Sequence, residues 1–239
     1  MNNPPYLWTF LIYATITIAS LVVWMIAGAL RQAGKTQIEY ARGIRIAGLE
    51  LFGWLGLAVF LGVLGVFRPA LDQPIPYIAF AIAFPIIIGA WFIFRTVSGA
   101  ELVRNTQQSW LIAVQSLRGL GSMFLVLNGI HFLPLEFAIP AGFGDAIVGV
   151  LAVPVAAYFW SGKPGRKVIA AAWNIFGIVD LVVAIATGFL TSPTPLQLLA
   201  FDNPNLLMGQ FPAVLIPTFA VPLWILLHLA SLKKLVTEK

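Results

Sequence analysis

Apolar residues in this chain are gathered into seven long runs, and the short segments between the runs hold most of the charged residues. Each run has the roughly 20 residues that an α-helix needs to cross a hydrocarbon core about 30 Å thick. The runs lack the alternation of apolar and polar residues that is typical of outer-membrane β-barrels. The pattern therefore predicts an all-α polytopic membrane protein, a single domain built as a seven-helix bundle. The predicted spans are residues 6–30, 44–67, 75–97, 110–133, 138–159, 168–190 and 212–232.

The composition agrees with a membrane environment. Of the 239 residues, 60% are hydrophobic and 10% are charged, whereas a soluble domain has about 25% charged residues. The chain contains no cysteine, which excludes disulfides, thiolate metal sites and cysteine nucleophiles. Its net charge of +5 comes from basic residues in short loops. We therefore expect the lipid bilayer as a partner, and no nucleic acid.

The loops differ strongly in positive charge. Lysine and arginine are concentrated in the first, third and fifth connections and in the C-terminal tail, whereas the second connection has only Arg68. By the positive-inside rule, we predict an N-terminus outside and a cytoplasmic C-terminus, in a plasma (inner) membrane. The basic residues of the predicted cytoplasmic segments are Arg31, Lys35, Arg42, Arg45, Arg95, Arg104, Lys163, Arg166, Lys167, Lys233, Lys234 and Lys239.

Two segments interrupt the regular pattern. The sixth connection, residues 191–211, contains three prolines, which prevent a continuous helix, and several leucines that are too apolar for a freely solvated loop. We expect this connection to lie on the outer surface of the bundle; a lid, an interfacial helix and a re-entrant piece are the alternatives. Pro217 and Pro222 lie inside the seventh span and predict a kinked helix, either static or part of a gate.

Three predicted spans each carry a charged residue near the middle: Arg118 in the fourth, Asp145 in the fifth and Asp180 in the sixth. A charge at the bilayer centre costs about 2.5–3.5 kcal/mol on insertion scales, so such residues normally face the bundle interior and pair. Counting the helical rise places all three roughly 14–20 Å from the cytoplasmic face. Asp145 also lies on a stripe of small residues, which allows a neighbouring helix to approach closely. We therefore expect the three groups to meet inside the bundle.

One arginine that faces two ionised acids leaves a surplus negative charge, so a shared proton is expected. This is the chemistry of a proton-linked binding site, in which Arg118 would hold an anionic group and one aspartate would exchange the proton. The alternative is a structural ion pair that fixes the order of the helices. The polar residues predicted to complete the binding site are Gln115, Ser122, Trp173 and Asn174.

Polar residues nearer the two membrane faces form a second set of candidates. Glu50 and His228 are predicted roughly 6–9 Å deep from the cytoplasmic side, where they would form a cytoplasmic exit or simply reach the solvated interface. Histidine titrates near neutrality, so this pair is suited to passing a proton. Asn128 and His131 lie near the outer end of the fourth span and would line an outer mouth or be solvated.

The sequence favours a transport protein. No metal-ligand spacing and no recognisable catalytic set is found, so we expect neither an enzyme nor a bound cofactor or metal. The leading hypothesis is proton-coupled movement of a small solute or ion past Arg118, Asp145 and Asp180. The alternative is a sensor or an accessory subunit of a larger membrane complex, with the charges purely structural. A membrane-protein partner or a homo-oligomer is compatible with either hypothesis.

Overall fold

The computed structural model describes residues 5–237, and within them every regular element is helical. Seven helical segments in this range are long and apolar enough to cross a membrane, which confirms the prediction of an all-α chain with seven apolar spans. The α-helices are α1 (Pro5–Gln32), α2 (Gln37–Val63), α3 (Tyr77–Arg95), α4 (Val97–Asn105), α5 (Gln108–Ala113), α6 (Met123–Gly129), α7 (Leu135–Trp160), α8 (Arg166–Thr191) and α9 (Val221–Thr237). The 3₁₀ helices are η1 (Val114–Ser122) and η2 (Leu207–Gly209), and η3 (Ile216–Ala220) is a π-helix.

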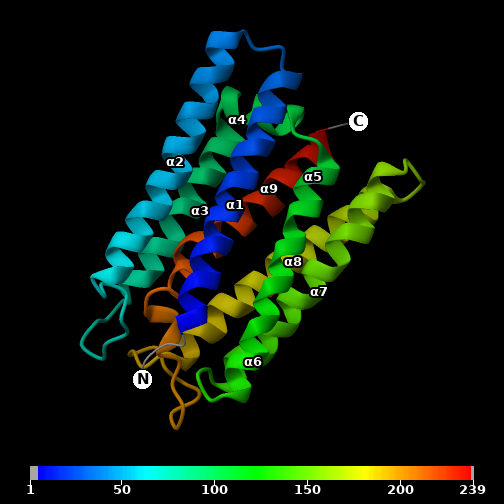
Figure 1. The fold of residues 1–239 in the computed structure, drawn as a ribbon. Helices are drawn as coiled ribbons and strands as arrows, with labels where there is room; N and C mark the ends of the chain where they lie inside the picture. Colours follow the sequence, from blue (N-terminus) through cyan, green and yellow to red (C-terminus); the bar gives the residue numbers. More distant parts are fainter. Residues whose placement is uncertain (1–4, 238–239) are drawn as a thin grey trace.

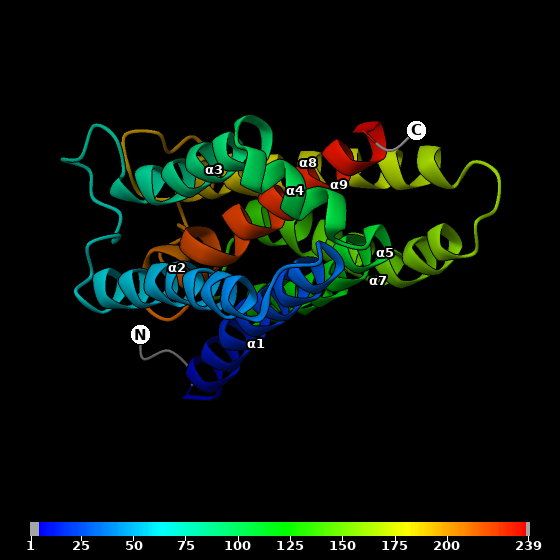
Figure 2. The same ribbon diagram turned by 90° about the horizontal axis from the view of Figure 1, so that it is seen from above.

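The bundle has two ends that differ in charge. Helix α1 begins at one end, and α9 finishes at the other (Figure 1). The α1–α2, α3–α5 and α7–α8 connections lie at the end where α9 finishes, and because they carry most of the lysines and arginines we call it the basic end. The opposite end holds the α2–α3 connection and residues 192–215 (Figures 1 and 2).

Helix α9 and the preceding π-helix η3 run through the middle of the bundle (Figure 2). In the span Ile216–Thr237, 72% of the most apolar 18-residue stretch is buried inside the structure. The corresponding share is 39% or less in the other described spans. Helices α3, α4, α5 and α8 pack on α9, while α1, α2 and α3 pack on η3. The kinked helix predicted from the prolines is therefore the central element of the bundle.

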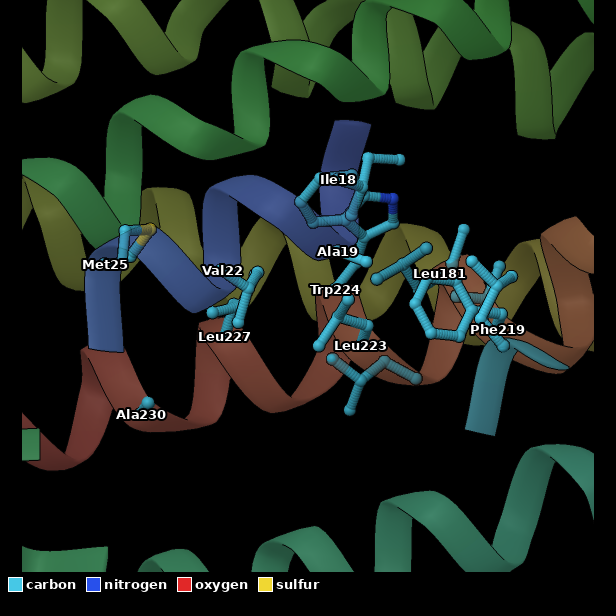
Figure 3. Packing of buried hydrophobic residues seen from close by; sticks show 14 of the residues in the cluster. Ile18, Ala19, Val22, Met25, Leu181, Phe219, Leu223, Trp224, Leu227 and Ala230 are labelled. Atoms are coloured by element: carbon cyan, nitrogen blue, oxygen red, sulfur yellow. The ribbon is translucent and has the colours of Figure 1, made fainter. Parts of the chain in front are cut away.

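The largest apolar cluster surrounds this central helix (Figure 3). Ile18 and Val22 of α1 and Leu181 of α8 pack against it, together with Phe219 of η3 and Trp224 of α9. All five side chains are nearly inaccessible to solvent. The first and last spans are thus held together by apolar packing over the length of the bundle.

The backbone carbonyl that Pro222 leaves without its helical donor has a partner on α2. Pro222 has no N–H to donate to the carbonyl four residues earlier, that of Thr218. The indole Nε1 of Trp54 donates to this carbonyl oxygen at 3.1 Å, and the Trp54 ring packs against Phe219 with centroids 4.7 Å apart. A backbone group beside a proline within a membrane span needs such a substitute partner.

Residues 192–215 fold back onto the end of α8. The Asn205 N–H donates to the Thr191 carbonyl at 2.9 Å, and Leu207 and Met208 are buried in an apolar cluster that includes Phe137 of α7. The only helix in this stretch is the single turn η2, as the prolines predict. The connection covers the opposite end of the bundle.

Close helix approach is most marked between η1 and α7. The predicted stripe of small residues on α7 is buried, and it includes Ala141, Gly149 and Ala152. A Cβ on Gly149 would collide with the backbone N and Cα of Gly119 in η1. The absence of a side chain at position 149 therefore sets the distance between these two helices.

Gly149→Ala tests this approach. Because the colliding atoms belong to a helix backbone, we expect the substitution to lower the free energy of unfolding by about 1–3 kcal/mol, as overpacking typically does. Gly53→Ala on α2 is the matched control, since a Cβ there meets nothing within 4 Å, and it should be neutral or stabilising by about 0.5–1 kcal/mol. Thermal unfolding of both variants in detergent measures the difference. Equal melting temperatures would contradict the close approach.

Candidate functional site

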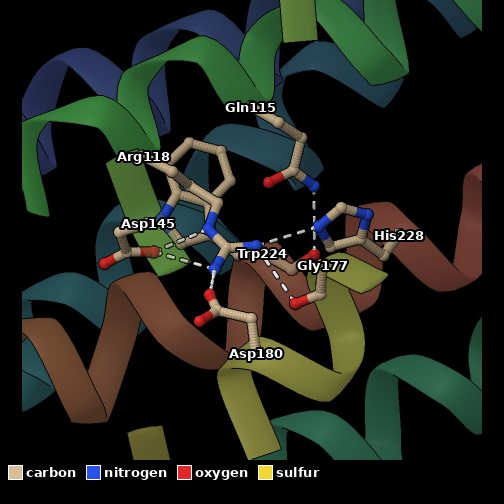
Figure 4. Close-up of polar contacts among 7 residues, drawn as sticks. All are labelled: Gln115, Arg118, Asp145, Gly177, Asp180, Trp224 and His228. Atoms are coloured by element: carbon tan, nitrogen blue, oxygen red, sulfur yellow. Dashed lines mark hydrogen bonds and ion pairs between the residues drawn. The ribbon is translucent and has the colours of Figure 1, made fainter. Parts of the chain in front are cut away.

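Arg118 of η1 lies at the centre of a polar cluster inside the bundle, with its side chain fully buried (Figure 4). Its Nε donates to Oδ1 of Asp145 at 2.8 Å, and Nη2 pairs with the same oxygen at 2.8 Å. Nη2 also donates to Oδ2 of Asp180. Nη1 donates to the Gly177 carbonyl and to Nε2 of His228, each at 3.1 Å. The three charged groups meet, as the sequence predicts.

These contacts give every nitrogen of the arginine a partner within the protein. A guanidinium has five N–H donors and no acceptor, and Arg118 makes four hydrogen bonds and one further ion-pair contact. In this arrangement no Arg118 nitrogen is without a protein acceptor, which differs from the sequence prediction that it holds the anionic group of a solute. Of the two carboxylates in the cluster, Asp145 is the more accessible, with 17% of its side chain exposed against 7% for Asp180.

His228 starts a chain of side-chain hydrogen bonds towards the basic end. Because Arg118 can only donate, Nε2 of His228 accepts, and the ring hydrogen lies on Nδ1. Nδ1 donates to Oδ1 of Asn174 at 2.9 Å, and Nδ2 of Asn174 donates to Oγ of Ser231 at 2.8 Å. Nε2 of Gln108, the first residue of α5, donates to the same Ser231 oxygen at 2.6 Å.

Glycines on the neighbouring helices make the space for the charged groups. A Cβ on Gly121 would collide with the carboxylate of Asp145, and one on Gly144 would collide with the carboxylate of Asp180. The sequence predicts small residues near the acids only as a face for helix packing. In the structure, glycines next to the carboxylates are required for the ion cluster itself.

Ser122 does not belong to the cluster, which corrects the sequence prediction. In an α-helix, Gln115, Arg118 and Ser122 share one face, since residues three, four and seven apart align. Residues 114–122 instead form a 3₁₀ helix, in which residues three apart are aligned. The inward face is therefore Gln115, Arg118 and Gly121, and Ser122 is exposed on the outside of the bundle.

Gln115 and Trp173 lie beside the cluster. Nε2 of Gln115 donates to the Trp224 carbonyl at 3.2 Å, and the Trp173 ring packs on His228 with centroids 5.1 Å apart. Oε1 of Gln115, Nε1 of Trp173 and Oε1 of Gln108 are buried without a hydrogen-bond partner. Buried polar atoms are normally satisfied, so these three atoms are sites where water or a ligand group would be favourable.

The structure separates Glu50 from His228, so the predicted cytoplasmic exit pair is not formed. His228 is completely buried against Arg118 and Asn174, whereas Glu50 is exposed on α2. The rise per residue gives the depth of a residue only in an upright helix, and the long side chain of Arg118 reaches beyond the level of its own backbone. Helix α9 instead crosses α1 and α2 obliquely (Figure 1), which brings His228 to the level of Arg118.

The two outer candidates belong to the connection between α6 and α7. Nδ2 of Asn128 donates to the Leu133 carbonyl at 2.9 Å, which closes the turn. His131 is exposed and has a φ of 62°, a left-handed backbone conformation typical of a turn. Their positions away from the Arg118 cluster give both residues a local role in the turn.

A cleft connects the cluster to the opposite end of the bundle. It has a volume of about 70 Å³. It is lined by residues of α3, α8 and η3, and it reaches Asp145. Ser192 and Thr194 of the connection at the opposite end line it, together with apolar side chains such as Phe124 and Leu181. This volume has room for a few water molecules. Asp145 is therefore the group of the cluster that a proton or solute from this end meets first.

The family of the chain is decided by residues 75–236, which match the family described as "Domain of unknown function (DUF8737)". The chain belongs to this family. No curated protein and no solved structure matches it. The matched region runs from just before α3 to nearly the end of α9 and so contains the whole Arg118 cluster, whereas α1 and α2 lie outside it.

Within residues 5–237, no group of three or more histidine, aspartate or glutamate side chains is placed to hold a metal ion.

Leucine at two adjacent positions tests the inward face of η1. We expect Ser122→Leu to keep the melting temperature of the wild type, because position 122 faces outward from the bundle. Gly121→Leu should destabilise the protein strongly, since even a Cβ at this position collides with Asp145. Thermal unfolding of both variants in detergent distinguishes the 3₁₀ register from the α-helical register. The reverse order of stability would restore the α-helical face and contradict the 3₁₀ register.

Proposed function

We propose that this protein is a proton-coupled transporter of a small solute, inserted in a plasma (inner) membrane with its basic end in the cytoplasm. The location of the basic residues supports this orientation through the positive-inside rule, since they lie in alternate connections at one end. The cleft that ends at Asp145 then opens towards the outside. The polar chain from His228 to Gln108 leads towards the cytoplasm.

The observation that carries the proposal is the placement of Asp145. This carboxylate is bonded to the buried Arg118 and at the same time lines the cleft. One guanidinium faces two carboxylates, and His228 is neutral when its Nε2 accepts a hydrogen bond. The cluster therefore has a surplus negative charge unless one carboxylate carries a proton. Charged residues within a membrane span commonly mark proton and substrate paths.

The solute would act through the same carboxylate. Every nitrogen of Arg118 already has a protein acceptor, so the group that competes for the cluster is a cation or hydrogen-bond donor that meets Asp145 from the cleft. Such a group would replace the shared proton, and the proton would leave. Exchange of this kind couples the two movements without requiring a new ligand for the arginine.

Proton movement in proteoliposomes tests the proposal. Protein is reconstituted with a pH-sensitive dye in the lumen, and small cationic, zwitterionic and anionic solutes are added outside. We expect a change in lumenal pH with at least one cationic or zwitterionic solute, and we expect Asp145→Asn to abolish it. Glu136→Gln is the matched control, because Glu136 is an exposed acid at the start of the same helix, and it should keep the response.

Two results would contradict transport. One is the absence of a pH change with every solute in the wild type, and the other is an unchanged response in Asp145→Asn. An accessory subunit predicts the first result together with a stoichiometric partner in solubilised native membranes. The melting temperature of each variant shows whether a lost response reflects lost folding.

A further inference from the structure

A second opening in the bundle lies between α2 and α3, on the other side of α3 from the Asp145 cleft. This groove has a volume of about 650 Å³, and its floor is formed by α9 residues including Leu223 and Leu227. Figure 2 shows α2 and α3 on either side of the central helix. The volume lies within the roughly 300–1,000 Å³ that is typical of small-molecule sites. Its lining shares no residue with that of the Asp145 cleft, and it includes none of Arg118, Asp145 and Asp180.

Glu50 is the one charged residue among those that line the groove. It lies at the midpoint of α2 (Gln37–Val63) and is exposed to the groove. Within residues 5–237, no hydrogen bond or ion pair is formed by its carboxylate. The two acids nearer the middle of their spans, Asp145 and Asp180, are both paired with Arg118.

The position of Glu50 along α2 makes this lack of a partner unfavourable. Glu50 is five residues beyond Arg45, the last basic residue of the helix, and this separation corresponds to about 7 Å of helical rise. An acid at this depth in an apolar span normally pairs inside the protein or faces water. The groove offers apolar walls instead, so a counter-charge from outside the chain would stabilise the carboxylate.

Aromatic side chains line the same groove as Glu50. Trp54 is one turn further along α2, on the same face as Glu50, and Phe84, Trp91 and Phe92 of α3 line the groove. The face of an aromatic ring attracts an organic cation, most strongly when water is excluded. A single negative charge, several aromatic rings and an otherwise apolar lining are complementary to a cation with a large apolar body.

We propose that the groove between α2 and α3 binds a lipophilic organic cation from the membrane, with Glu50 as its counter-ion. The apolar body of the ligand fills the space between α2, α3 and α9, and its charge lies between Glu50 and the aromatic rings. This site is separate from the Arg118 cluster and does not depend on proton-coupled transport. It also lies partly on α2, outside the region that defines the family.

Two ions of the same shape and opposite charge test the proposal. Binding of tetraphenylphosphonium and of tetraphenylborate is measured by equilibrium dialysis on protein in phosphatidylcholine nanodiscs, with empty nanodiscs subtracted. We expect saturable binding of tetraphenylphosphonium and not of tetraphenylborate. Glu50→Gln should weaken the binding of the cation about tenfold or more, since a charge–charge contact in a partly desolvated site is lost. Glu136→Gln should leave it unchanged.

One further variant and one stability measurement make the result decisive. Ala47→Phe adds a side chain to the groove wall one turn before Glu50 and should abolish binding with the carboxylate intact. Glu50→Gln removes an unpaired charge, so it should melt no lower than the wild type, and a loss of binding then reports the site itself.

Several outcomes would overturn the proposal. These are equal binding of the two ions, unchanged binding in Glu50→Gln, and unchanged binding in Ala47→Phe. A wild-type dimer that Ala47→Phe converts to a monomer, without saturable cation binding, would identify the groove as an interface between two copies of the chain. Tight retention of phosphatidylethanolamine that depends on Glu50, again without cation binding, would identify it as a lipid site.

Discussion

A guanidinium keeps its positive charge in proteins and has five N–H donors, so burying one in an apolar bundle requires an acceptor for each donor. Arg118 meets this requirement with two carboxylates, a backbone carbonyl and an imidazole nitrogen. These acceptors come from α7, α8 and α9, while the arginine lies on η1. Four spans are therefore fixed relative to one another by the solvation of one side chain, and the surrounding backbone has to leave room for it.

This requirement explains features that otherwise look unrelated. Glycines at 121, 144 and 177 stand where a Cβ would collide with Asp145, Asp180 or His228. The 3₁₀ geometry of η1 brings Gly121 to the inward face, next to the carboxylate that lines the cleft. Asp145 is also the more accessible of the two carboxylates in the cluster. The proposed exchange of a proton or solute at Asp145 thus follows from the way in which the arginine is buried.

Long-range patterns in the sequence predict most of the fold. Seven apolar runs predict the spans, and the cost of an unpaired charge in a membrane predicts that Arg118, Asp145 and Asp180 meet. The local geometry of residues 114–122 could not be predicted, because 3₁₀ and α-helices share the same apolar composition, and Ser122 was therefore placed on the wrong face. The depth of His228 also depends on the tilt of α9. The rise per residue measures distance along a helix axis and says nothing about the tilt of that axis. The unpartnered Glu50 emerges only when the α2–α3 groove is known.

The stability of three neutralised variants tests the central claim, that one closed cluster holds these spans together. The variants are Arg118→Met, the pair Asp145→Asn with Asp180→Asn, and all three substitutions together, compared by unfolding in detergent. Breaking a buried ion pair on one side costs about 3–5 kcal/mol, whereas replacing the whole cluster can be neutral or stabilising. We predict that the first two variants are strongly destabilised and that the triple variant regains most of the stability. Wild-type melting in all three variants, or a triple variant less stable than either of the others, would contradict the closed cluster.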